Sequence, residues 1–356
     1  MRLGIIGSNE LGSSLLSCLS SLGHEVFLSE NHENNIEVIG KTDIIFCCVT
    51  TEILPSNIYD IKNVMDVVED FGVAFEQEIY VTDKILVICS TLNPGDTKEI
   101  NEILSPMNMK VCYLPFIFKD EKVLKYIQNQ EKIIIGSIDP QVVELIGNIV
   151  LKFQNGSPTI VSMTSKSAEL CKLALNSFIA YKINFANMVG ELLLNYNLQE
   201  EIKIVLTTLS GHNVVGNKNF DYGFGYGGPI LPSDNRVFGE FCNRNKIEFV
   251  LPYVTEDFNK QHNHFLKKYF VSQNPNKSEP FVIDGLGYNQ ETDSYIESSK
   301  LNLVYDLLRE GYIVHILENE KFIRESKLPK EMINDFSGRV KFFKKGTNPK
   351  GIYITT

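Results

Sequence analysis

The first thirty residues contain the pattern that most restricts how this chain can fold. Residues 2–6 form a short apolar run that stops at Gly7, and leucines then recur at helical spacing from Leu11 to Leu22. A second short run at 25–29 ends at the acid Glu30. Strand, glycine turn, helix, strand and acid is the order of a dinucleotide-binding βαβ unit. This opening therefore predicts an α/β fold with a doubly wound parallel sheet.

The glycine motif of this unit is incomplete, because Asn9 stands where a middle glycine would let the backbone approach a phosphate. Asparagine adopts a positive φ more readily than most residues, which would preserve the turn. Glu30 would repel the extra phosphate of NADP, so the sequence predicts NAD. The alternative is a sheet whose nucleotide site has decayed. The predicted cofactor-binding residues are Gly7, Asn9, Glu10, Leu11, Gly12, Glu30, Thr51 and Thr91.

Two further apolar runs, at 44–49 and 85–89, predict buried parallel strands of the same sheet. Thr51 and Thr91 follow them, beyond the strand ends where ligands of open α/β sheets bind. A helix should start at 94–97, and a strand at 132–136 with a helix at 140–151 should complete the domain. The segment 31–41 is short for such a sheet, which predicts that one unit is trimmed.

Composition excludes several classes of protein. The 356 residues carry a net charge of −10, and a surface that negative argues against binding nucleic acid. No apolar run approaches the roughly 20 residues that span a bilayer, so no membrane association is expected. Seven cysteines and six histidines show neither metal-ligand spacing nor a disulfide pattern. We therefore expect no metal site and a reducing, cytoplasmic compartment.

Residues 164–196 give the strongest helix signal in the chain, and a helix of about 30 residues would be roughly 45 Å long. Such a helix typically joins two domains or forms a dimer interface. Lys172 and Asn176 are four residues apart and share one face. They could present a cation and an amide to an oxygen that acquires negative charge. The alternative is an exposed lysine beside a polar neighbour.

A glycine-rich segment follows at 222–234, with four glycines between positions 223 and 228. Glycines at this density suit a loop whose backbone approaches a ligand closely, although a tight structural turn is the alternative. Asp234 is predicted to cap a helix at 235–246. After a further helix at 252–270, a strand at 281–284, a helix at 298–310 and a strand at 312–317 predict a second, smaller α/β unit.

Four of these segments, in this order, resemble the UDP-glucose/GDP-mannose dehydrogenase family. They are STLNPGDT at 90–97, AELCKLALN at 168–176 continuing to AYKI at 180–183 and Asn187, GYGG at 225–228, and GLGY at 285–288 running to Glu297 and Ser298. The resemblance implies two Rossmann-like domains joined by a long helix that forms a homodimer. It also implies that the first domain binds NAD and that the substrate is a nucleotide sugar, for which we expect a UDP-sugar. In the family the C6 alcohol of the sugar is oxidised to a carboxylate in two hydride transfers.

The resemblance divides the chain into an NAD-binding domain at 1–155, a central helical dimerisation domain at 156–275 and a nucleotide-sugar-binding domain at 276–356. It assigns catalysis to Lys172, Asn176, Asp234 and Thr91. It assigns substrate binding to Lys172, Asn176, Tyr222, Gly225, Tyr226, Gly227 and Gly228.

Several positions depart from the family pattern. The family cysteine of the glycine loop is Ile230 here, after Pro229 in place of a serine. Other charged residues of the family are also replaced. A family glutamate is Phe116 here, and the arginine that reaches in from a neighbouring subunit is Val214. Two family lysines are Ser233 and Asn289, and a further arginine is Ile296. An aldehyde can give a second hydride only after a nucleophile adds to its carbonyl, and Cys171 and Cys89 are poorly placed to replace the missing thiol.

Three functions remain open at this point. The first is an NAD-dependent oxidoreductase limited to one hydride transfer on a nucleotide sugar. The second is a catalytically silent homologue that binds a nucleotide or nucleotide sugar in a regulatory or scaffolding role. The third is a dimeric structural protein without a ligand.

Overall fold

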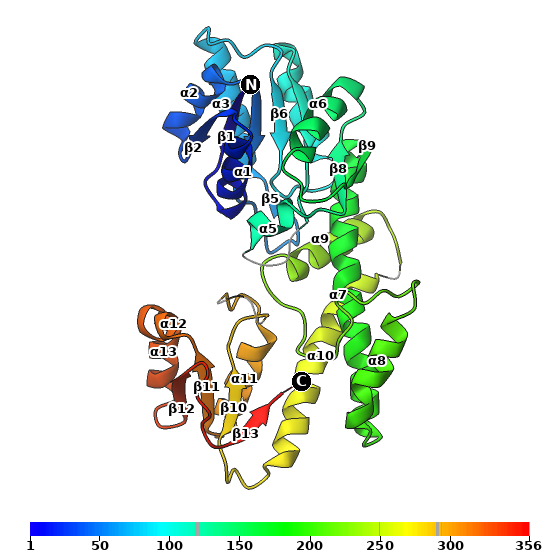
Figure 1. The fold of residues 1–356 in the computed structure, drawn as a ribbon, viewed down its shortest axis with the longest axis vertical. Coiled ribbons are helices and arrows are strands. Elements are labelled where there is room, and N and C mark those ends of the chain that lie inside the picture. The colour runs from blue at the N-terminus through cyan, green and yellow to red at the C-terminus, as the bar shows by residue number, and fades with distance from the viewer. Residues whose placement is uncertain (118–121, 249, 290–291, 293, 356) are drawn as a thin grey trace. The chain divides into compact units, whose positions relative to one another are not determined.

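The computed structural model describes residues 1–117, 122–248, 250–289, 292 and 294–355, without the side chains of residues 32 and 33. The chain forms two compact units. The first comprises Met1–Leu175 with Glu240–Lys246, and the second comprises Asn176–Gly239 with Ile247–Thr356. Figure 1 labels their elements. The three domains expected from the sequence, with boundaries at 155 and 275, remain a prediction, because the division into two compact units does not test them.

Seven strands form one sheet in the first unit, in the order β2-β1-β3-β6-β7-β8-β9. In that order they span Glu25–Ser29, Arg2–Ile6, Ile44–Cys47, Ile85–Ile88, Lys110–Tyr113, Lys132–Gly136 and Thr159–Met163. Neighbours are parallel except β7 and β8, which pair antiparallel. The five predicted strands are confirmed. The expectation that the strand at 132–136 completes the sheet is wrong, because β9 pairs with it along five residues.

Helices cover both faces of this sheet. They are α1 (Glu10–Ser21), α2 (His32–Lys41), α3 (Lys62–Glu76), α4 (Asp96–Leu104), α5 (Val123–Ile127) and α6 (Pro140–Leu151), with a short 3₁₀ turn at Ser105–Met107 and a hairpin of β4 (Glu52–Ile53) and β5 (Tyr59–Asp60). The expectation of a trimmed unit is wrong. Asn31 caps α2 by accepting a hydrogen bond from the Asn34 amide (3.2 Å), and this ten-residue helix connects β2 to β3.

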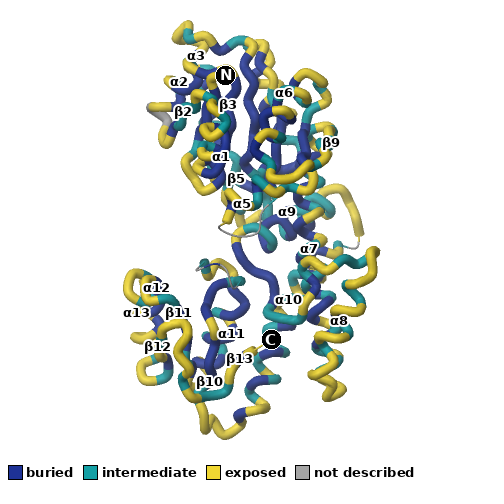
Figure 2. The backbone as a smooth tube through the Cα atoms, viewed as in Figure 1, coloured by how far each residue is buried: buried dark blue, intermediate teal, exposed yellow. Residues whose placement is uncertain are grey.

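The core of the first unit lies in two layers, one on each side of the sheet. Alternate residues of β3 point to opposite layers: Ile44 and Phe46 join the side chains of α1 and α6, whereas Ile45 and Cys47 join those of α3 and α4. Figure 2 shows the inner strands of this sheet as mostly buried, whereas the edge strands β2 and β9 are mostly partly buried. The carboxyl ends of the strands remain available for a site.

The helix α7 (Ser165–Asn195) has 31 residues, as the sequence predicted, and the division between the two units falls within it, after Leu175. The second unit continues with a 3₁₀ turn at Gln199–Glu201, α8 (Ile202–Ser210), the first part of α9 (Leu231–Arg244) and α10 (Leu251–Gln273). The last residues of α9, from Glu240, belong to the first unit. The helix α9 begins four residues before the predicted start. Asp234 therefore lies in its first turn and is not its N-cap, which corrects the sequence-based assignment.

A parallel four-stranded sheet in the order β12-β11-β10-β13 completes the second unit. Its strands span Val340–Lys344, Val314–Glu318, Phe281–Asp284 and Ile352–Ile354, and its helices are α11 (Ser299–Arg309), α12 (Glu320–Glu325) and α13 (Lys327–Asp335). The predicted α/β architecture, with two such sheets and a long helix, is confirmed. Among the helices of the described ranges, none is both long and apolar enough to cross a membrane.

Candidate functional site

The glycine turn of the first unit is as tight as the sequence pattern requires. Gly7 has a φ of +106°, and a Cβ atom there would lie 2.7 Å from the carbonyl carbon of Cys48. A Cβ atom on Gly12 would lie 1.9 Å from the carbonyl oxygen of Gly7. These distances are far below van der Waals contact. Both positions therefore require glycine so that α1 can start close against β1 and β3.

Asn9 has a role that the sequence did not predict. Its φ is −61°, so the expected positive φ is wrong. Its side chain is the N-cap of α1, where Oδ1 accepts a hydrogen bond from the Gly12 amide (3.0 Å) and Nδ2 donates one to the Cys48 carbonyl. The turn is thus held by side-chain hydrogen bonds at the helix N-terminus where a phosphate would bind. Glu10 is exposed in the first helical turn and Leu11 is buried in the core.

A cavity of about 290 Å³ opens beside this turn, close to the lower size limit of small-molecule sites. Its wall includes Gly7, Asn9, Glu30 and Thr50, whereas Thr51 is not among the lining residues. Two more lining residues are hydrogen-bonded: Ser29 donates to Asn35 (2.6 Å), which donates to Asp70 (2.7 Å). A glycine cradle, a helix N-terminus and an acid that can accept hydrogen bonds from ribose hydroxyls fit the adenosine part of NAD.

Lys172 lies in the first unit and is 7% exposed, so the alternative of an exposed lysine is wrong. Its Nζ donates a hydrogen bond to the Thr91 hydroxyl and lies 5.9 Å from the centre of the Tyr59 ring. The structure therefore brings together two of the predicted catalytic residues. The loop after β6 supplies Thr91, and α7 supplies Lys172.

Asn176 and Asp234 form a second buried pair, in the second unit. Asn176 is 3% exposed, Asp234 is fully buried, and Asn176 Nδ2 donates to Asp234 Oδ2 at 2.5 Å. The next residues repeat this contact between α7 and α9, because Ser177 donates a hydrogen bond to Asn235 at 2.8 Å. The carboxylate thereby fixes the orientation of the Asn176 amide, whose Oδ1 must face away from Asp234.

The glycines of the loop after residue 222 are already required by packing within the second unit. A Cβ atom on Gly225 would lie 2.3 Å from Asn259 Oδ1, and one on Gly227 would lie 2.5 Å from the Glu297 carbonyl oxygen. Gly228 has a φ of +86° and lies against the ring of Tyr288. The tight structural turn, one of the two readings of this loop, therefore explains these glycines without a ligand.

Buried polar side chains that the sequence analysis did not assign hold the start of this loop. Asn187 Oδ1 accepts a hydrogen bond from the Gly223 amide (2.9 Å). The fully buried His262 ring contacts the Gly223 carbonyl through Nε2 (2.7 Å) and Glu191 through Nδ1 (2.6 Å). His262 shares a spacing of four with Leu266 and Phe270, which are buried too. That helical periodicity was the signal that His262 faces the core.

Three of the buried cysteines are not ready nucleophiles. Burial raises the pKa of Cys47 and Cys112 to about 12 and that of Cys89 well above its ordinary value. Ile230 is partly buried, and its carbonyl accepts the Asp234 amide at 2.9 Å. At two other divergent positions, Phe116 belongs to the apolar core and Val214 is 94% exposed. Within the described ranges no group of three metal-ligating side chains occurs.

Comparison with known protein families identifies related chains. The NAD-binding domain of the UDP-glucose/GDP-mannose dehydrogenase family matches residues 31–154, and the central domain of the same family matches residues 166–261. Together these matches cover more than half of the chain. The NAD-binding domain of that family is therefore present, which confirms the prediction that NAD is the cofactor.

Individual relatives are distant. A protein of uncharacterized function from Methanocaldococcus jannaschii is 27% identical over 203 residues, which are 56% of this chain and 22% of that protein. UDP-glucose 6-dehydrogenase from Pseudomonas aeruginosa is 21% identical, with 87% of this chain and 77% of that enzyme aligned. The structure of a UDP-glucose dehydrogenase from Pyrobaculum islandicum superimposes with a TM-score of 0.79 at 20% identity, over 96% of this chain and 86% of that one. At that identity the superposition establishes the fold alone.

Proposed function

This chain belongs to the UDP-glucose/GDP-mannose dehydrogenase family, and we propose that it is an NAD-dependent oxidoreductase that removes a single hydride from an alcohol of a nucleotide sugar. One observation carries the proposal. Lys172 and Asn176 are four residues apart on α7, and each is buried and hydrogen-bonded to another residue expected to be catalytic. A UDP-sugar is the substrate we favour.

The chemistry requires stabilisation of an oxygen that becomes negative. The substrate carbon loses a hydride, its hydroxyl loses a proton to solvent, and bound NAD supplies the hydride acceptor. Lys172 Nζ and the Asn176 amide would hold the oxygen while the charge develops. Thr91 positions the lysine through its hydroxyl, and Asp234 positions the amide. The proposed substrate loop contributes Tyr222, Gly225, Gly227 and Gly228. At Tyr226 it contributes the backbone, because the side chain lines a different cavity.

The reaction is expected to stop at the aldehyde. A second oxidation needs a nucleophile to convert the carbonyl carbon into a tetrahedral adduct that carries a hydride. The family thiol is replaced by Ile230, and the family glutamate falls on Phe116, a residue of the apolar core. The buried thiols of Cys47, Cys89 and Cys112 are protonated at neutral pH, because burial raises their pKa.

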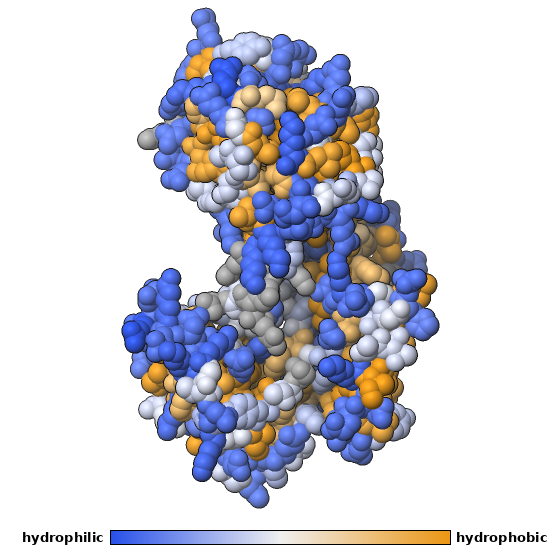
Figure 3. All heavy atoms as spheres, viewed as in Figure 1, coloured by the Kyte–Doolittle hydropathy of each residue, from blue (hydrophilic) through white to orange (hydrophobic). Residues whose placement is uncertain are grey.

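The second candidate is a silent homologue that binds a nucleotide or nucleotide sugar. It is favoured by the loss of the family's charged residues at several positions, including Ser233, which is buried in α9, and Ile296, which is exposed. In either case we propose a homodimer that forms through α7 and α8. Phe178 (61% exposed), Leu192 (56%) and Ile204 (61%) present large apolar side chains there, and apolar atoms are visible over these helices in Figure 3.

The decisive experiment measures the NADH formed per sugar consumed, with purified protein, NAD and a panel of UDP-, GDP- and TDP-sugars. We expect one equivalent. Lys172→Ala should lower the turnover by on the order of 10²–10³, the usual effect of losing a group that stabilises an oxyanion. Lys166→Ala is the matched control, since Lys166 is exposed on the same helix. Two equivalents would refute the single transfer. Binding of a nucleotide sugar without NADH would establish the silent homologue.

A further inference from the structure

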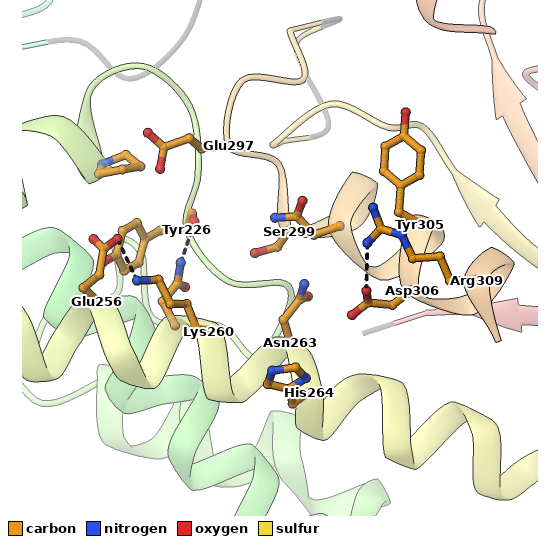
Figure 4. Close-up of a pocket in the computed structure, with 13 residues that line it drawn as sticks. Tyr226, Glu256, Lys260, Asn263, His264, Glu297, Ser299, Tyr305, Asp306 and Arg309 are labelled. Atoms are coloured by element: carbon orange, nitrogen blue, oxygen red, sulfur yellow. Dashed lines mark hydrogen bonds and ion pairs between the residues drawn. The ribbon is translucent and has the colours of Figure 1, made fainter. Parts of the chain in front are cut away.

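The second unit contains a polar cavity of about 480 Å³, a size typical of small-molecule sites. Figure 4 shows that two helices face each other across it. The helix α10 contributes Glu256, Lys260 and Asn263, and α11 contributes Tyr305 and Asp306, among others. Tyr226 of the glycine loop also lines it. The nucleotide cavity beside Gly7 belongs to the first unit, so the two cavities are distinct.

The wall of this cavity has hydrogen-bonding groups that the protein does not satisfy. Eight buried side-chain nitrogen or oxygen atoms have no partner in the described part of the chain, and four of them belong to residues that line this one cavity. They are the Tyr226 hydroxyl, Glu256 Oε2, Asn259 Oδ1 and Asn263 Oδ1. Buried polar atoms are costly unless something bonds them, so a cluster of four calls for a ligand or for bound water.

The orientation of two of these groups is well defined. Asn259 Nδ2 donates to the Tyr226 carbonyl at 2.9 Å, so its Oδ1 is left as an acceptor. Tyr226 is only 4% exposed and its ring is enclosed by protein. Burial, together with the nearby charges of Glu256 and Glu297, raises its pKa, so the phenol keeps its proton and can donate. The residues that line the cavity thus carry three unpaired acceptors and one unpaired hydroxyl, all four of them buried in the structure.

The charges around the cavity compensate one another. Arg236 bonds both oxygens of Glu297 (2.9 and 2.6 Å) and lies 3.4 Å from Glu256. Lys260 lies 3.5 Å from Glu256, and Arg309 lies 3.6 Å from Asp306. A phosphate or a metal ion would have to break one of these pairs to find an uncompensated charge. The balance favours a neutral ligand.

We propose that this cavity binds a neutral polyhydroxylated molecule, such as a free sugar or a cyclic polyol, at a site separate from that of the nucleotide sugar. Ligand hydroxyls donate to Glu256, Asn259 and Asn263 and accept from the Tyr226 hydroxyl, which satisfies all four unpaired atoms. The proposal depends neither on NAD binding nor on turnover.

The test titrates the full-length protein with D-glucose, myo-inositol, putrescine or inorganic phosphate at millimolar concentrations and follows binding by saturation-transfer NMR. We expect glucose or inositol to bind, and excess UDP-glucose not to displace it. Tyr226→Phe removes only the unpaired hydroxyl and should weaken binding about three- to tenfold. Tyr222→Phe is the matched control, because its hydroxyl is also unpaired but lines another cavity.

Thermal unfolding without ligand checks that the variants fold. Tyr226→Phe should unfold at the same or a higher temperature than the natural protein, since it loses no hydrogen bond. If Tyr226→Phe does not fold, Asn263→Leu takes its place in the binding test, because it also removes an unpaired atom of the cavity wall. The proposal is overturned if neither polyol binds, if both variants bind as tightly as the natural protein, if UDP-glucose displaces the polyol, or if only putrescine or phosphate binds.

Discussion

Replacing Asn9 by glycine tests how this divergent dinucleotide motif works. The change removes the hydrogen bonds to the Gly12 amide and the Cys48 carbonyl and restores the middle glycine of the motif. Exchanging an asparagine cap for glycine costs a few tenths of a kcal/mol. Losing the bond to Cys48 costs about 0.5–1.5 kcal/mol, and the greater backbone freedom of glycine adds roughly 0.5 kcal/mol. We expect a total loss of about 1–2 kcal/mol in the free energy of unfolding.

The same change should strengthen cofactor binding. In the natural protein the Asn9 side chain occupies the N-terminus of α1, where the backbone of a complete motif would contact the pyrophosphate. Without that side chain we expect NAD to bind about three- to tenfold more tightly, which corresponds to roughly 0.6–1.4 kcal/mol. Calorimetric titration with NAD and urea denaturation measure the two effects in one preparation.

Asn319→Gly provides the control for a lost helix cap. Asn319 caps α12 in the second unit by accepting a hydrogen bond from the Phe322 amide at 2.6 Å. That variant should lose some stability and keep the NAD affinity of the natural protein. If Asn9→Gly binds NAD no more tightly, the side chain does not limit the approach of the phosphates. If it is as stable as the natural protein, the two hydrogen bonds contribute nothing in solution.

Four other predictions concern the loop, the thiols and the missing nucleophile. His262→Phe should lower the free energy of unfolding by about 2–4 kcal/mol in urea denaturation, because two buried oxygens lose their partner, whereas the exposed His264→Phe should change it little. A thiol reagent at pH 8 should label only the partly exposed Cys171 and Cys242 in the folded protein. Because burial raises the pKa of core thiols from 9.0 to about 12, they ionise first in the unfolded chain, so stability should fall as the pH rises through that window. In Ile230→Cys the new thiol should add to the aldehyde carbon while its proton passes to the aldehyde oxygen, and loss of a hydride to a second NAD should then leave a thioester. The thioester should accumulate and be visible by mass spectrometry, because Phe116 replaces the family glutamate that helps hydrolyse it. An unmodified protein after turnover would contradict the proposed position of that side chain.

Much of the fold was predictable because its signals are local. Five strands of the first sheet, the long helix and the first two strands of the second sheet follow from apolar runs and helical spacing. The strands β7 and β9 were missed because each mixes polar with apolar residues, although β7 lies inside the sheet and β9 at its edge. The helix α2 was missed because its cap, Asn31, follows the acid of the motif directly and the segment has few apolar residues.

The candidate site was predictable only in part. Sequence spacing placed Lys172 and Asn176 on one helix, but not the pairing of Thr91 with Lys172 or of Asp234 with Asn176, which depends on contacts between distant segments. The role of Asn9 as a cap was missed, because the dinucleotide motif and the capping preference make competing predictions for the same residue.

The retained polar residues do not by themselves establish catalysis. Lys172, Asn176 and Asp234 are all buried and hydrogen-bonded, so losing any of them would disturb the fold even without a substrate. The divergent Val214 and Ile296 lie at exposed positions, where substitutions are tolerated easily. Packing alone would thus disfavour substitutions at the three buried positions and tolerate them at the two exposed positions. A loss of activity in a Lys172 or Asn176 variant therefore supports catalysis only if the variant keeps its stability and its affinity for the nucleotide sugar while its turnover falls.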